Sequence, residues 1–156
     1  MHRLPNKALQ PTQKNARLKS GVRSMNKNEK NILIKDWILN QKTVWALEKL
    51  NSIVVRSHDE AWSIVIEIAE KATSDDILAS LAAGPMEDML CAYGDHYYDL
   101  IKKASETSFN FKRALLMGIR ITGPGSEKIK KLINEIRLER NLLKMVGIHI
   151  YNQINK

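Results

Sequence analysis

The chain has 156 residues, 44% of them hydrophobic, and a single cysteine, Cys91. This length and composition favour one folded domain, and the lone cysteine excludes an internal disulfide and fits a reducing compartment. The sequence has no run of 18 apolar residues, and its first 24 residues lack the apolar core of a secretory signal, so we expect a cytoplasmic protein without a membrane span.

The net charge of +8 is unevenly distributed along the chain. Residues 1–56 carry a net charge of +9, residues 57–100 carry −9, and residues 101–156 carry +8. This pattern predicts either an acidic surface that attracts a basic partner or pairing of the acidic middle with the chain's own basic ends.

Residues 1–24 contain six Lys or Arg, two prolines and no acidic side chain, which is typical of a flexible basic extension. They fit an arm that binds nucleic acid, a transit peptide, or a non-functional extension upstream of a start at Met25. Residues 6–14 resemble the translated edge of repeats that flank mobile gene cassettes in some proteobacteria, which favours the third interpretation. We therefore predict an extension at 1–24, a helical core domain at 25–122, and a long C-terminal helix at 123–156 that packs on or extends from the core.

Four helices are predicted between residues 28 and 81, because apolar side chains recur there at spacings of three and four residues. Their caps are expected at Asn28, at Ser57 with Glu60, and at Thr73 with Asp76. The predicted buried positions are Leu33, Ile34, Trp37, Ile38, Val44, Leu47, Val54, Trp62, Val65, Ile66, Ala69, Ile77, Leu78 and Leu81. All three tryptophans, Trp45 included, are expected in the core.

The stretch LAAGPMEDML at residues 81–90 interrupts the helical pattern with Gly84 and Pro85. Gly84 suits a helix end where the backbone takes a positive φ, and Pro85 suits the first position of the next helix. Glu87 and Asp88 then lie in a first turn, where the helix dipole favours acidic side chains. The sequence predicts a tight corner between two helices.

Gly94 and Asp95 repeat this pattern, since Gly94 can close one helix and Asp95 can cap the next. Tyr97 and Tyr98 point to different faces of that next helix, so at least one of them is expected to be exposed. The predicted buried positions of these helices are Met86, Met89, Leu90, Tyr93, Leu100, Ile101 and Ala104.

Ser108 is a candidate cap for a further helix, and a long helix is predicted to start at Ser126 after a TGPGS loop. Beyond Glu139 the apolar residues of this long helix shift to another side of it, which predicts a kink or a frayed end. The predicted buried positions are Phe111, Ala114, Leu115, Ile119, Ile129, Leu132, Ile133 and Ile136. Because no segment alternates like a strand, we predict an all-α fold, an irregular array of short helices stacked as hairpins.

Residues from about 37 to 136 resemble an uncharacterised family of bacterial helical domains. The resemblance rests on the Trp45 helix, DEAW at 59–62, LAAGPMEDML at 81–90, Gly94, and FKRAL at 111–115. It implies a small helical fold and brings no catalytic residue with it.

The first functional hypothesis is a non-catalytic protein-interaction module, of an immunity or accessory type, whose acidic surface binds a basic protein. The candidate contact residues lie at predicted helix starts and are Asp59, Glu60, Glu87, Asp88, Asp95 and Asp99. The alternative for these acids is pairing within the chain or a solvated surface.

A second hypothesis is nucleic-acid binding through Lys130, Arg137 and Lys144, which repeat every seven residues on the last helix. A third is an enzyme that uses Asp95, His96 and Asp99, although these are too few ligands for a metal site. Cys91 is expected in the core. Since the sequence has no phosphate loop and no nucleophile elbow, it predicts no catalytic residue, no metal and no cofactor.

Overall fold

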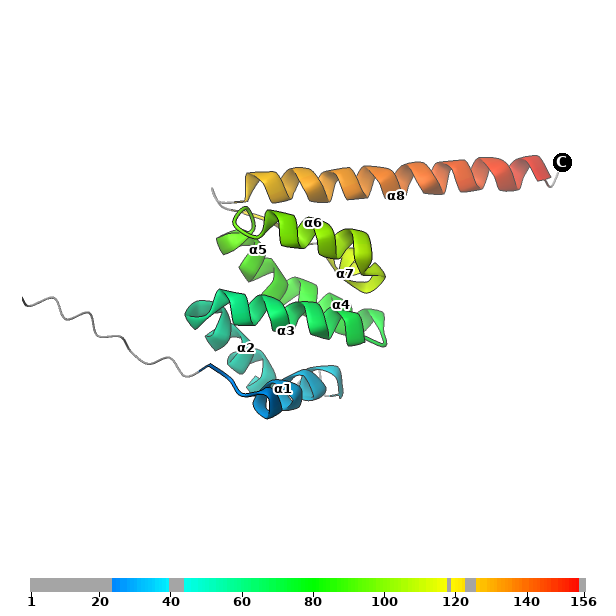
Figure 1. Ribbon diagram of the computed structural model, residues 1–156. Coiled ribbons are helices and arrows are strands. Elements are labelled where there is room, and N and C mark those ends of the chain that lie inside the picture. Colours follow the sequence, from blue (N-terminus) through cyan, green and yellow to red (C-terminus); the bar gives the residue numbers. More distant parts are fainter. Residues whose placement is uncertain (1–23, 40–43, 118, 123–125, 155–156) are drawn as a thin grey trace, which may run out of the picture.

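The computed structural model describes residues 24–39, 44–117, 119–122 and 126–154. This part of the chain is all-α, as predicted, and Figure 1 shows its helices stacked from α1 at one end of the molecule to α8 at the other. The helices are α1 (Lys27–Leu39), α2 (Val44–Arg56), α3 (His58–Lys71), α4 (Asp75–Leu81), the π-helical turn η1 (Ala82–Met86), α5 (Glu87–Tyr93), α6 (Tyr98–Thr107), α7 (Phe109–Leu115) and α8 (Glu127–Ile154). Residues 1–23 of the predicted extension lie outside the described residues.

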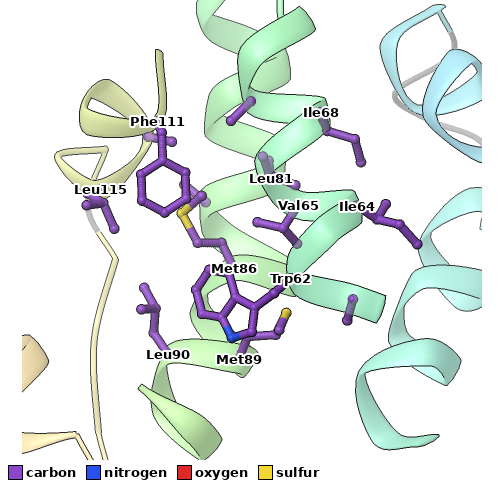
Figure 2. Packing of buried hydrophobic residues seen from close by; sticks show 14 of the residues in the cluster. Trp62, Ile64, Val65, Ile68, Leu81, Met86, Met89, Leu90, Phe111 and Leu115 are labelled. Atoms are coloured by element: carbon purple, nitrogen blue, oxygen red, sulfur yellow. The ribbon is translucent and has the colours of Figure 1, made fainter. Parts of the chain in front are cut away.

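The core is built around α3, which packs against α1, α2, α4, α5 and α7. Its buried side chains form one broad apolar face, made of Ala61, Trp62, Ile64, Val65, Ile68 and Ala69. Trp62 of α3 is buried and lies 5.5 Å from the ring of Tyr97 and 6.4 Å from that of Phe111. Figure 2 shows Met86, Met89 and the indole of Trp62 in one apolar cluster with Phe111.

The caps of the first helices differ from the predicted ones. Asn26, not Asn28, caps α1, because its side chain accepts the Glu29 amide at 2.9 Å while the Glu29 carboxylate accepts the Asn26 amide at 2.9 Å. Ser57 does precede α3, but its side chain makes no capping hydrogen bond, and Glu60 turns elsewhere. The reciprocal capping pattern therefore exists at α1, two helices earlier than the sequence suggests.

Of two further predicted caps, the one for α4 is wrong and the one for α7 is correct. The side chain of Ser74, rather than Thr73, accepts the Ile77 amide at the start of α4. Ser108 caps α7 as predicted, since its hydroxyl accepts the Phe111 amide at 3.2 Å.

Helix α2 is rotated relative to the prediction. Val44, Trp45 and Leu47 are exposed, Trp45 to 46%, so the expectation of a buried face through Val44 and Leu47 and of a core Trp45 was wrong. The buried face runs instead through Ala46, Leu50, Ile53 and Val54. The polar stretch at 40–43 that precedes α2 lies outside the described residues.

The predicted corner at Gly84 is present, but its geometry differs. The chain runs from α4 through η1 into α5 with a kink at Gly84, where φ is −137° and ψ is −108°. The prediction of a positive φ was therefore wrong. Pro85 follows the kink and is buried, and an added Cβ at Gly84 would lie 3.8 Å from Leu47 Cδ1, an ordinary contact.

Gly94 ends α5 with right-handed helical angles, φ −54° and ψ −47°. It matters because of what lies next to it: a Cβ there would overlap the carbonyl oxygen of Leu90 and come within 2.9 Å of Ile129 Cγ1 on α8. Gly94 thus lets the first turn of α8 lie directly against the end of α5.

The burial of Tyr97, Tyr98 and Leu100 differs from the prediction. Tyr97 is buried and Tyr98 is half-buried, so neither of them is exposed. Leu100 is exposed, whereas Ile101 and Ala104 are buried as predicted.

Helix α8 is one unbroken element of 28 residues, so the kink or frayed end predicted beyond Glu139 is absent. Its first half is buried through Ile129, Leu132, Ile133 and Ile136. Its second half extends past the rest of the molecule, as Figure 1 shows for the orange and red part of the ribbon.

In the part of the chain that the structure describes, no helix combines the length and apolar character needed to cross a membrane.

Candidate functional site

Three of the six proposed partner-binding acids, Glu60, Glu87 and Asp95, accept hydrogen bonds from backbone amides of distant segments. Glu60 Oε1 accepts the Met25 amide at 2.8 Å and the Ser24 hydroxyl at 3.3 Å. Asp95 Oδ1 accepts the amides of Lys128 at 2.9 Å and of Ile129 at 3.2 Å. These carboxylates are therefore occupied within the chain.

Asp95 caps a helix, but not the one predicted. The first amides of a helix have no partner within it, and an acidic side chain placed there also meets the positive end of the helix dipole. Asp95 serves this function for α8, whose first turn contains Lys128 and Ile129. Helix α6 begins after Tyr97 without a side-chain cap.

Glu87 and Cys91 lie one turn apart on α5 and bind the same segment. Glu87 Oε2 accepts the Arg120 amide at 2.9 Å, and Cys91 Sγ accepts the Thr122 amide at 3.3 Å. Cys91 is half-buried rather than fully in the core. Together the two side chains fix residues 119–122 along α5.

The remaining proposed contact residues fall into two groups. Asp59 accepts the hydroxyl hydrogen of Tyr97, whereas Asp88 and Asp99 are exposed and make no ion pair within the described residues. The six acids therefore do not act as one free surface.

Other acids of the middle segment pair with bases from both basic ends. Asp75 pairs with Arg113. Glu67 lies 2.8 Å from Lys30 Nζ and 2.6 Å from Lys71 Nζ. Hydrogen bonds from Lys30 and then from Lys71 hold the pKa of the Glu67 carboxyl below its ordinary value.

A cluster of aromatic and imidazole rings surrounds Tyr97. His58 lies against the Tyr93 ring at 4.5 Å, and its Nδ1 contacts the Tyr97 hydroxyl, which donates to Asp59. The His96 ring is 4.7 Å from the Tyr97 ring and 6.1 Å from the His58 ring. Burial, reinforced by the Asp59 carboxylate, raises the pKa of Tyr97, so this phenol stays protonated and acts as a donor.

This ring cluster bears on the enzyme hypothesis. His96 lies beside Asp95, but the Asp95 carboxylate is engaged by α8, and Asp99 is exposed on α6. Among the residues that the structure describes, no three His, Cys, Asp or Glu are grouped so as to hold a metal ion. His58, which sequence reasoning overlooked, contacts the Tyr97 hydroxyl through Nδ1, and only a tertiary contact could have revealed it.

The three basic residues proposed for nucleic-acid binding have different surroundings. Lys130 pairs with Glu127 at 2.6 Å, and the Arg137 guanidinium donates to the Ile119 carbonyl at 3.4 Å. Lys144 is exposed on the second half of α8. Two of the three therefore take part in contacts of the fold.

The second half of α8 carries apolar side chains that no other described part of the chain covers. Leu143 is 66% exposed, and Phe109 at the start of α7 is 77% exposed. Two further exposed apolar side chains, Leu142 and Met145, occupy this part of α8, and exposed Leu138 precedes it near the end of the first half. Single exposed leucines are common, but a group of them on one projecting helix is typical of an interaction surface.

A groove of about 620 Å³ separates this part of α8 from α7. Its apolar lining comes from Phe109, Leu116, Met117 and Leu143. Its charged lining consists of Asp75, Lys112, Arg113, Glu139, Arg140 and Lys144. Sequence reasoning missed this groove because it interpreted the shifted apolar positions beyond Glu139 as a kink or a frayed end of the helix.

Comparison with protein families gives a match over most of the chain. The model of DUF6869, a family of unknown function, matches residues 35–141. No curated protein matches the chain significantly, and no solved structure does. The match includes α7 and the first half of α8, and it ends just before Leu142.

Proposed function

The chain belongs to DUF6869, a family of unknown function, and from this premise we propose that it is a non-catalytic protein-binding module. Its contact surface is the second half of α8 together with the start of α7, not the acidic helix starts. The observation that carries the proposal is the exposed apolar set on the projecting part of α8, with Phe109 opposite Leu143.

The physical reason is the cost of leaving such side chains in water. Burying a leucine or phenylalanine side chain contributes about 1.5–3 kcal/mol, so a partner that covers Leu143 and Phe109 gains a large share of the free energy of a moderate complex. A projecting helix also lets a partner approach from several sides. Helices bound in apolar grooves are a recurrent mode of protein recognition.

The acidic residues do not support the original form of this hypothesis. Glu60, Glu87 and Asp95 accept backbone amides of the chain itself, so a basic partner would have to displace those contacts. A carboxylate that accepts backbone amides stabilises the fold, and its oxygen atoms are then less available to a partner.

The test is site-specific photo-crosslinking in the native host. A photoreactive phenylalanine analogue replaces Leu143 in one variant and Val55 in a matched control, since Val55 is also exposed but lies on α2, at the other end of the stack. We expect a discrete crosslinked species from position 143 that position 55 does not give. Identical patterns from both positions, or none from position 143, would remove the proposal.

A further inference from the structure

The groove between α7 and the second half of α8 has the chemistry of a specific kind of partner. We infer that it binds an acidic amphipathic helix of another protein. This inference rests on the proposed function and adds the charge and shape of the partner.

The unpaired charges at the groove are positive. Arg113 pairs with Asp75, and Lys112 pairs with Glu139 at 2.8 Å. Both carboxylates at the groove are thus neutralised by bases of α7. Arg140 and Lys144 remain without an ion pair among the described residues.

The floor of the groove is apolar. Phe109 and Leu143 stand on its two sides and are mostly exposed, while Leu116 and Met117 are half-buried against the core. The guanidinium of Arg113 lies 5.4 Å from the centre of the Phe109 ring, which orients that ring. A volume of about 620 Å³ suits several apolar side chains of a partner and falls within the range of roughly 300–1,000 Å³ that is typical of binding pockets.

An amphipathic helix matches this arrangement. Its apolar side chains, spaced three and four residues apart, would enter between Phe109 and Leu143, and acidic side chains on its flank would meet Arg140 and Lys144. Arg140 and Lys144 are four residues apart on one helix, so they present two cations about one turn apart. Carboxylates at the same spacing on a partner helix would pair with both.

A nucleic acid fits the groove less well. Single-stranded nucleic acid needs several aromatic platforms along a basic track, whereas the groove offers one aromatic ring, Phe109, among Leu and Met side chains. The basic peptide segment at residues 1–24 also fails as an occupant, because it has the same charge sign as Arg140 and Lys144.

The experiment measures binding of labelled probes to the full chain by fluorescence anisotropy. The probes are a helical peptide of about 16 residues with leucines at helical spacing and glutamates on its other face, the same peptide with lysines in place of glutamates, and a single-stranded oligonucleotide. We expect the acidic peptide to bind at least about tenfold more tightly than the basic one. This preference should fall as salt rises.

Two variants localise the binding. Arg140→Glu with Lys144→Glu should weaken the acidic peptide by about tenfold or more and favour the basic peptide. Lys103→Glu with Lys131→Glu reverses two exposed charges on α6 and the first half of α8, away from the groove, and is the matched control that should leave binding unchanged. Circular dichroism and thermal unfolding of each variant show whether the fold is kept.

The outcomes are separable from those of the crosslinking test. Equal binding of both peptides, tighter binding of the oligonucleotide, or indifference to the Arg140 and Lys144 reversals would overturn the acidic-helix inference. If Leu143 still gives a specific crosslink, the protein-binding function stands and only the chemistry of the partner changes. If Leu143 gives none, the function fails as well.

Discussion

At Gly94 the fold has room for a hydrogen atom and for nothing larger. A Cβ would overlap the Leu90 carbonyl oxygen and lie 2.9 Å from Ile129 Cγ1. The first of these neighbours is backbone, which cannot move without distorting α5, so overpacking cannot be relieved by a rotamer change alone. The position is decided by packing between α5 and α8 rather than by backbone angles.

We therefore predict that Gly94→Ala lowers the free energy of unfolding by about 1–3 kcal/mol, measured by urea denaturation. Gly84→Ala is the matched control, because its new Cβ meets only Leu47 Cδ1 at 3.8 Å. The loss at Gly84 should be clearly smaller. A larger loss at Gly84 than at Gly94 would contradict this account and restore a conformational requirement at the kink.

For Asp95 the sequence predicts the chemical role of the side chain but not the helix on which it acts. A short acidic side chain directly after a glycine predicts an acceptor for helix amides, and that chemical role is correct. The amides belong to α8, 33 and 34 residues further along the chain, and not to the adjacent helix. Local sequence gives no information on which distant helix end is brought to a carboxylate.

At the scale of the elements, the spacing of apolar residues predicted the buried positions correctly where neighbouring helices pack on several sides of a helix. The predicted positions of α3 and α4 are buried or half-buried because neighbouring helices surround them. It failed for α2, whose buried face is narrow: Leu47 lies at the edge of that face and Val44 lies beyond it, so both stay exposed. The sequence contains enough apolar residues on α2 for more than one stripe, and only the packing partners select one.

The two halves of α8 should differ in their contribution to stability. We predict that removing residues 142–156 changes the free energy of unfolding by about 1 kcal/mol or less, because Leu142, Leu143 and Met145 are exposed. Ile133→Ala, in the buried half, should cost about 2–5 kcal/mol. Chemical denaturation of the two variants compares these losses, and a truncated chain that no longer unfolds cooperatively would contradict the division.

At the scale of the whole molecule, the uneven charge is partly neutralised by folding. Acids of the segment at 57–100 meet bases from both sides, as Glu67 meets Lys30 and Asp75 meets Arg113. Exposed pairs of this kind contribute little each, typically about 0–1 kcal/mol. Their effect on the molecule is to leave fewer free acids for a partner than the sequence alone suggests.

The apolar core is continuous from α1 to the first half of α8, from Leu33 to Ile136. We therefore predict that the first half of α8 unfolds together with the core, although the sequence suggested separate segments at 25–122 and 123–156. Native-state hydrogen exchange should give the amides around Ile133 the same free energy of opening as those around Val65 in α3. Faster exchange around Ile133 than around Val65 would mean that α8 opens independently.

The attachment of α8 at its amino-terminal end makes the helix a rod of known direction. Asp95 fixes its first turn, Gly94 lets it lie close to α5, and its 28 residues span about 42 Å. A group carried near its far end is held at a set distance and angle from the body of the molecule. A partner that meets such a preorganised end loses less conformational entropy on binding than one that must first order a flexible tail. The rod therefore sets where Leu143 stands relative to Phe109, and deleting a turn between the buried half of α8 and Leu143 would separate the two sides of the contact surface.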